Sequence, residues 1–209
     1  MREGRRRSPP AVIAGVLLAA GCAAPEPGEV VVDAEAGSVE FGARVNAAGF
    51  AEGETAGYHL IVYRGGGAAE GALLRADVTD VAVLDALEEL GAVPGDALGL
   101  DVWEERHDPQ SWQPERVIAG PPVEISVQAE AGGPFLGLDR ILDDVAGVGF
   151  EMRFGGHRAN IPAWSSGCVA CLYSCPGSKV GNARCTVRDF VEGLAPFRVR
   201  TGVLPDDGE

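Results

Sequence analysis

The segment that decides the fold of this chain is residues 58–63, which reads YHLIVY and is followed by three glycines at 65–67. Its β-branched and aromatic residues predict a buried strand. His59 is expected to be an ordinary residue of this strand rather than a ligand. The glycine triplet lacks the Gly-Lys-Ser/Thr ending of a phosphate-binding loop, so residues 65–67 predict a plain loop.

A capped amphipathic helix follows this strand. Thr79 is a favourable N-cap, apolar residues recur at positions 83, 84, 87 and 90, and Gly91 suits the C-terminal end. A second helix is predicted where Thr186 and Asp189 have the spacing of a capping box. A third, short helix is predicted at residues 138–145.

The other apolar segments predict strands. They are residues 30–32, 38–45, 98–102, 117–118, 123–127, 148–154 and 197–203. About 180 residues of mature chain fit one domain with a real core. The sequence therefore predicts a single α+β domain with a mostly antiparallel sheet, two or three short helices and a cysteine-rich loop near the C-terminus.

The N-terminus has the layout of a secretory signal. Arginines precede an apolar run at residues 11–20, and small residues stand directly before Cys22. The run is about half the ~20 residues that a membrane-spanning helix needs. The small residues resemble the bacterial lipobox, which predicts a signal peptide at 1–21, lipidation of Cys22 and a flexible tether at 22–29. We expect a lipid-anchored protein of the bacterial cell envelope, facing the periplasm or the exterior, with the membrane as a partner.

The charge of the chain excludes one class of partner. The formal net charge is −14, and removal of residues 1–21, which hold four arginines and one glutamate, leaves −17. Such a surface repels nucleic acid, because the phosphate backbone is itself negative. The main domain is expected at residues 30–204, and residues 205–209 are expected to form a frayed acidic tail.

Four cysteines gather near the C-terminus, within a cysteine-rich segment at residues 165–185. Cys168, Cys171, Cys175 and the following proline reproduce the last three cysteines of the bacterial four-iron run C-x2-C-x2-C-x3-C-P. Ser165 stands in place of the first cysteine. A [4Fe-4S] cluster would therefore need a fourth ligand from Cys185 or from a histidine such as His157. Cys185 precedes a predicted helix N-terminus, where the dipole would stabilise a thiolate.

The same cysteines allow other chemistry. An even number of cysteines in an exported domain is typical of structural disulfides, although Cys168 with Cys171 would close a very small loop. A zinc site is less well matched, because the sequence has one C-x2-C knuckle rather than two. Thiol exchange through Cys168 and Cys171 lacks the βαβ context of thioredoxin-like proteins.

Several segments resemble a known family. Residues 58–63, 72–74, 77–78 and 84–95 look like the YdjY-type domain of bacterial envelope proteins, most clearly in the Leu-Gly-Ala-x-Pro-Gly motif at 90–95. Residues 166–177 resemble the cysteine segment of its ferredoxin-like members. The resemblance covers most of residues 30–204. It implies an envelope location and brings no established reaction.

Two functions follow as hypotheses. In the first, the domain is an iron–sulfur or redox module for electron transfer, with Cys168, Cys171, Cys175 and Cys185 as ligands and a redox or envelope protein as partner. In the second, it is a non-enzymatic binding or scaffold domain stapled by disulfides. The sequence leaves open whether the protein is an enzyme and favours a non-enzymatic role. Serine hydrolase chemistry is not expected, because no Gly-x-Ser-x-Gly elbow is present, and the histidines at 59, 107 and 157 form no metal-binding pair at helical spacing.

Overall fold

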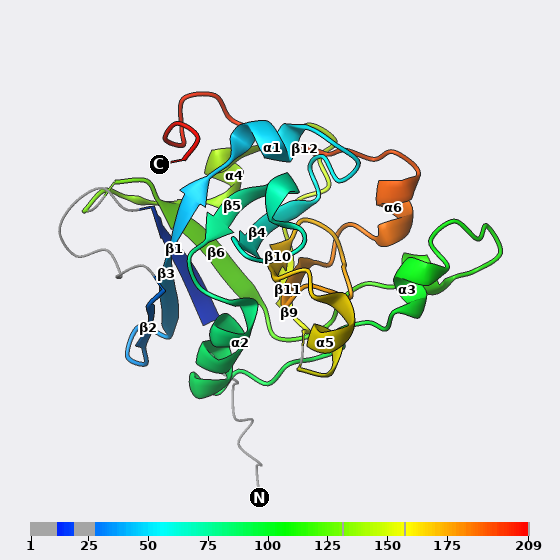
Figure 1. Cartoon of the computed structure of the whole chain (residues 1–209), viewed down its shortest axis with the longest axis horizontal. Coiled ribbons are helices and arrows are strands. Elements are labelled where there is room, and N and C mark those ends of the chain that lie inside the picture. Colours follow the sequence, from blue (N-terminus) through cyan, green and yellow to red (C-terminus); the bar gives the residue numbers. More distant parts are fainter. Residues whose placement is uncertain (1–11, 19–27, 131, 157, 209) are drawn as a thin grey trace, which may run out of the picture.

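A curled, mixed sheet of ten strands runs through the domain (Figure 1). The computed structural model describes residues 12–18, 28–130, 132–156 and 158–208. The strands of this sheet follow the order β7-β6-β1-β3-β5-β4-β10-β11-β9, and β2 pairs with β3 beside this path. Two further strands, β8 and β12, pair with each other. Antiparallel pairings outnumber parallel ones, six to four, so the predicted α+β fold with a mostly antiparallel sheet is confirmed.

The bounds of the elements are as follows. The strands are β1 (Val12–Leu18), β2 (Val30–Asp33), β3 (Ser38–Val45), β4 (His59–Tyr63), β5 (Ala72–Ala76), β6 (Val123–Gln128), β7 (Phe135–Gly137), β8 (Leu142–Asp144), β9 (Met152–Phe154), β10 (Cys168–Cys171), β11 (Val180–Asn182) and β12 (Phe197–Val199). The α-helices are α1 (Ala47–Ala51), α2 (Asp80–Glu89), α3 (Asp101–Glu104), α4 (Leu138–Ile141), α5 (Ile161–Trp164) and α6 (Val187–Val191). Short 3-10 turns occupy Ala69–Gly71, Gln113–Glu115 and Arg158–Asn160.

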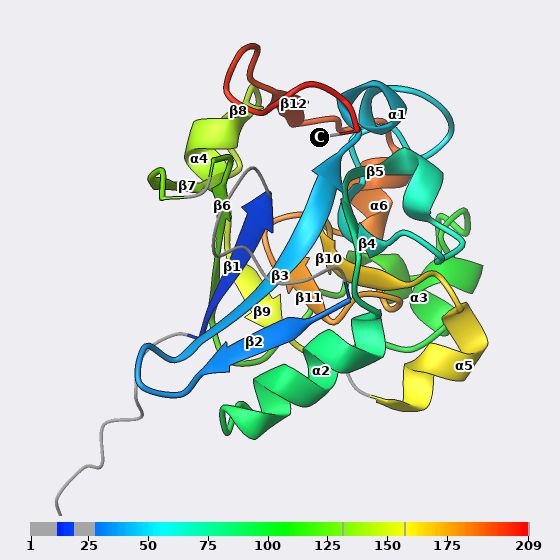
Figure 2. The ribbon, with the colours of Figure 1, turned by 60° about the vertical axis from the view of Figure 1, so that its left-hand side comes forward.

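Four of the six α-helices of the described residues lie at two ends of the domain, and α3 and α6 lie along a third side (Figure 1). Helices α1 and α4 lie with β12 at one end, whereas α2 and α5 lie at the other (Figures 1 and 2). The predicted caps are present: the Thr79 side chain accepts a hydrogen bond from Ala82 N at the start of α2, and Thr186 and Asp189 form a complete capping box on α6. The described residues contain six α-helices instead of two or three, because four-residue and five-residue helices are too short to show a periodicity.

The strand predicted at residues 98–102 is wrong. Leu98 adopts φ +62° and its N–H donates to the Asp96 carboxylate at 2.9 Å, which turns the chain. Helix α3 then begins at Asp101. Residues 117–118 are likewise not a strand; only an isolated bridge joins Asp96 and Ala119 nearby. The apolar residues that suggested strands instead pack as a small second cluster, in which Leu98, Val102 and Ile118 are buried.

Strand β1 comes from the N-terminal apolar run. It lies between β3 and β6 and pairs in parallel with both. The sequence predicts that this segment belongs to a signal peptide at residues 1–21. Cys22 and the tether as far as residue 27 lie outside the described residues. Among the described residues, no helix combines the length and the apolar character that crossing a bilayer requires.

The acidic tail docks on the domain rather than fraying along its described length. The Asp207 carboxylate accepts hydrogen bonds from the N–H groups of Ala47 and Ala48, at 2.6 and 3.1 Å. Gly208 N–H donates to the Val45 carbonyl at 2.9 Å. A carboxylate satisfies the free amides at a helix start, so Asp207 supplies the cap that Asn46 does not provide for α1.

Strand β4 sits at the centre of the sheet, as its composition indicated. It pairs in parallel with β5 and antiparallel with β10, and residues 59–62 are buried. Both faces are covered, which explains the apolar run without polar alternation. The strand that carries the first two clustered cysteines therefore lies directly beside the segment 58–63.

Candidate metal centre

The pairing of β4 with β10 places His59 opposite Cys171. On a regular strand, residues three apart such as Cys168 and Cys171 would point to opposite faces of the sheet. The register shifts between Cys168 and Ala170 and again between Ala170 and Cys171. This irregularity brings both cysteine side chains to the same place, as bulges commonly do at functional sites.

The close approach of two loops fixes the position of this strand. The N–H groups of Gly67 and Ala68 donate to the carbonyls of Ser165 and Ser166, and Tyr63 N–H donates to Gly167. A Cβ on Gly66 would come within 2.3 Å of the Ser166 carbonyl oxygen. The glycine triplet thus lets the loop after β4 lie against the chain that enters β10, consistent with its prediction as a plain loop.

Three donor atoms converge in the core. Cys168 Sγ and Cys171 Sγ lie 2.9 Å apart, and His59 Nδ1 lies 3.8 and 3.4 Å from them respectively. All three atoms fall within 4.8 Å of one another. Both cysteines are fully buried and His59 is 7% exposed. The described cysteines at 168, 171, 175 and 185 are all free thiols.

Cys168 and His59 shift each other's pKa in the direction that favours a thiolate beside an imidazolium. Burial acts to raise the pKa of Cys168, but hydrogen bonds from Cys171 and His59 and the charges of His59 and Lys179 lower the pKa to about 6. Burial acts to lower the pKa of His59, yet its hydrogen bond and attraction to Cys168 raise that pKa above its ordinary value. Burial, followed by the neighbouring Cys168 and Cys175, raises the pKa of Cys171 well above its ordinary value. Cys168 therefore carries the first negative charge of the group.

Cys175 lies next to this group and contacts it through Cys171. Its hydrogen bond with Cys171 lowers the pKa of the Cys175 thiol against the effect of burial, and Gly177 N–H donates to its Sγ at 3.4 Å. The hydroxyl of Tyr58 is buried beside the Cys175 thiol, which is its one hydrogen-bonding neighbour among the described residues although the geometry of a regular hydrogen bond is not reached. Burial, followed by the charges of Cys175 and Cys171, raises the pKa of Tyr58. Cys175 and Tyr58 thus border the group that His59, Cys168 and Cys171 form.

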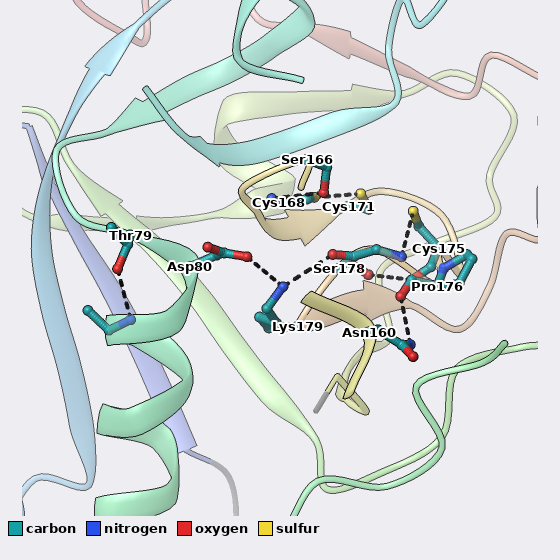
Figure 3. Close-up of polar contacts among 12 residues, drawn as sticks. Thr79, Asp80, Asn160, Ser166, Cys168, Cys171, Cys175, Pro176, Ser178 and Lys179 are labelled. Atoms are coloured by element: carbon teal, nitrogen blue, oxygen red, sulfur yellow. Dashed lines mark hydrogen bonds and ion pairs between the residues drawn. The ribbon is translucent and has the colours of Figure 1, made fainter. Parts of the chain in front are cut away.

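A buried ion pair lies behind the cysteine loop. Lys179 Nζ lies 2.7 Å from a carboxylate oxygen of Asp80, the first residue of α2, and 3.3 Å from the Gly177 carbonyl oxygen (Figure 3). The Lys179 side chain is 3% exposed and that of Asp80 11%. Gly155 and Gly156 both donate to the Lys179 carbonyl. The ammonium thus joins the cysteine loop to α2 and adds positive charge near Cys168.

The predicted fourth ligand is not part of the group. Cys185 is buried and precedes α6, but the Asp189 carboxylate of the capping box occupies the helix N-terminus. Burial, followed by Asp189 and Asp144, raises the pKa of Cys185 to about 12. The capping carboxylate therefore opposes the stabilisation of a Cys185 thiolate that this helix was predicted to provide. Ser165 is exposed in a left-handed turn after α5, and His157 lies outside the described residues.

His59 is the site residue that sequence reasoning missed. Its prediction as a strand residue is confirmed, because it begins β4, but it also faces the two thiols. The one histidine in a run of aliphatic and aromatic residues is the only sequence signal for this. Residues 59 and 171 are far apart along the chain, so their proximity depends on strand pairing.

Fold and site together define an α+β domain with a buried cysteine–histidine group between two central strands. The family profile of the YdjY domain matches residues 30–209, and the chain belongs to this family. A protein of Escherichia coli (strain K12) described as uncharacterized protein YdjY is 30% identical over 150 residues, which are 71% of this chain. The match covers 62% of that relative's length. No solved structure matches the chain.

Proposed function

We propose that this domain is a metal-binding module that holds one soft cation on His59, Cys168 and Cys171, with Cys175 as fourth ligand. The convergence of three donor atoms within 4.8 Å in the core carries the proposal. Thiolate and imidazole ligands suit Zn²⁺ and Cu⁺ rather than hard cations such as Mg²⁺ or Ca²⁺. Metal binding would displace the remaining thiol protons to solvent.

The separations fit a single ion. Ligands at about 2.0–2.3 Å from a tetrahedral Zn²⁺ lie about 3.5–3.8 Å from one another. His59 Nδ1 is already 3.4 and 3.8 Å from the two sulfur atoms. The two sulfur atoms, 2.9 Å apart, would need to separate by under about 1 Å. For His59, Cys168 and Cys171, only a small side-chain adjustment is therefore required, whereas Cys175 lies outside these three converging donors and would have to move in as the fourth ligand.

An iron–sulfur cluster for electron transfer is the competing function. Its support is the C-x2-C-x3-C-P spacing, which supplies three thiols beside His59. The thiolates of a four-iron cluster bind different irons and need wider spacing than ligands that share one ion. The compact group, the exposed Ser165 and the separate Cys185 therefore favour a single ion.

Thiol exchange is less well supported by the same geometry. An attacking thiolate must reach a sulfur atom of the partner's disulfide. Cys168 and Cys171 are both 0% exposed, although Cys168 is the more acidic thiol. A structural disulfide staple remains the alternative that chemical analysis of the thiols would reveal.

We also propose that the domain is anchored in the bacterial envelope through a lipid on Cys22. The arginines, the apolar run at 11–20 and the small residues before Cys22 support this proposal, which requires cleavage before Cys22 and therefore the removal of β1 from between β3 and β6. Such an anchor would hold the metal group outside the cytoplasm. Its partner there would be the membrane and an envelope protein rather than nucleic acid.

Metal analysis of the purified protein tests the proposed function. We expect one Zn²⁺ or Co²⁺ per chain, with sulfur-to-cobalt charge-transfer absorption for the Co²⁺ form. His59→Ala and Cys168→Ser should weaken binding by more than about 100-fold, since loss of supporting residues alone costs 10–100-fold. His107→Ala, in an exposed loop, and Cys185→Ser are matched controls that should bind normally.

Two results would overturn the single-ion proposal. A brown protein with about four irons and four inorganic sulfides would establish the cluster. A colourless protein that binds no metal and has no reactive thiols after denaturation without reductant would establish disulfides, because the four cysteines are buried in the native state. In the first case Cys185→Ser shows whether that residue is a ligand.

A further inference from the structure

A pocket of about 560 Å³ reaches from solvent to His59. It is formed by the segment that follows α1 and by the loop between β4 and the 3-10 turn at Ala69–Gly71. Three glutamates line it, at positions 52, 54 and 70, together with Thr55 and several glycines. Cys168 and Cys171 do not line the pocket. His59 is therefore the member of the group that links the thiols to solvent.

The pocket is strongly negative. Glu52, Glu54 and Glu70 are exposed, and none of them forms an ion pair within the part of the chain that the structure describes. Clefts lined by charge of one sign concentrate counter-ions and raise their association rates by 10–1,000-fold. An acidic patch alone would indicate only solubility. Here a histidine that is 7% exposed stands in the same pocket and contacts two buried thiols.

We infer that this acidic pocket is the route by which the cation reaches the thiols, so that the bound ion is exchangeable. The inference rests on the proposed metal-binding function. Carboxylates attract any cation but bind soft cations weakly, whereas thiolate and imidazole bind them tightly. A soft cation would thus pass from the glutamates to His59 and the cysteines. The module would capture and release an ion of the Zn²⁺ or Cu⁺ class rather than keep a permanent structural one.

Stopped-flow loading with Cd²⁺ tests this route, with thiolate-to-cadmium absorption as the signal. The pocket variant combines Glu52→Gln, Glu54→Gln and Glu70→Gln. A matched control combines Glu35→Gln, Glu89→Gln and Glu124→Gln, which are exposed glutamates outside the pocket lining. Both variants change the net charge by the same amount. They therefore separate local attraction from the overall charge of the protein.

At low salt we expect the association rate of the pocket variant to fall about 3–10-fold, and that of the control to change by less than about 1.5-fold. The difference should vanish near 1 M salt, where the Debye length is about 3 Å. The association rate of the unmodified protein should itself fall with salt, as the net negative charge of the chain alone requires, so only the difference between the two variants assigns the attraction to the pocket. Equal loading rates in both variants, with one Cd²⁺ bound per chain, would overturn the route and leave the metal-binding function intact. Absence of Cd²⁺ binding in the unmodified protein would overturn both.

Discussion

His59 has two roles in the structure, and only the first of them can be inferred from its position in the sequence. It is a paired residue of the central strand β4, and its Nδ1 contacts the sulfur atoms of Cys168 and Cys171. The imidazole and the Cys168 thiolate stabilise each other's charge in a core that excludes water. Such a pair commonly occurs in metal-binding sites and in sites with a reactive cysteine nucleophile.

The Cys168 thiolate predicts a pH dependence of the metal-free protein. Its folded pKa of about 6 lies below the ordinary value of 9.0, so its contribution to stability is complete above pH 9 and is lost as the pH falls through about 6. The raised pKa of His59 acts in the opposite direction: its contribution is complete below pH 6.5 and is lost as the pH rises through its folded value. The charged pair is thus weakened at acid pH by protonation of Cys168.

Urea unfolding between pH 5 and 9, in the presence of a chelator, would measure this effect. The free energy of unfolding of the unmodified protein, minus that of Cys168→Ser, should decrease as the pH is lowered from 6.5 to 5, because His59 is largely charged in both states over this range and only Cys168 still gains a proton. A difference that is independent of pH would contradict the assigned thiolate. The subtraction removes the contribution of the many surface carboxylates.

At the scale of elements, α2 and the cysteine loop are joined by the ion pair of Lys179 and Asp80. Both side chains are nearly excluded from water. Removal of one partner of a buried pair leaves an uncompensated charge and costs about 3–5 kcal/mol. Lys179→Met should therefore lower the free energy of unfolding by about this amount.

A double-mutant cycle would identify the pair as the cause. Asp80→Asn added to Lys179→Met should restore part of the lost stability, because no buried charge then remains. Chemical denaturation of the four proteins measures the coupling. Simple addition of the two single effects would contradict a direct interaction. Because Thr79 still caps α2 in every variant, the helix itself should persist.

At the scale of the whole molecule, the metal should stabilise the native state. A ligand that binds only the folded protein adds about 2.7 kcal/mol when its concentration is 100 times the dissociation constant. For a domain of this size, this corresponds to about 5–10 °C in the melting temperature. We expect this rise with Zn²⁺ and its reversal by a chelator.

Thermal denaturation of His59→Ala provides the comparison. Its melting temperature should be nearly insensitive to Zn²⁺, whereas that of His107→Ala should respond as the unmodified protein does. An equal rise in His59→Ala would mean that the ion binds elsewhere. The acidic surface, with a net charge of −14, is the obvious other place.

The sequence by itself determined the elements whose signals are local. The cap of α2 by Thr79, the capping box of α6 and the buried composition of residues 58–63 all depend on neighbours along the chain, and each is confirmed. The cysteine spacing likewise located the candidate site within residues 165–185. The strand predicted at 98–102 failed because a single left-handed residue, Leu98, turned an apolar segment into a helix start.

Only the tertiary structure decided which residues form the site. The pairing of β4 with β10 brings His59 to Cys171 across 112 positions, and an irregular register brings Cys168 to the same face. The capping carboxylate of Asp189 meanwhile disfavours a thiolate at Cys185. Spacing along the chain constrains residues only over short distances, whereas strand register and burial determine which distant donor atoms meet and which charges they carry.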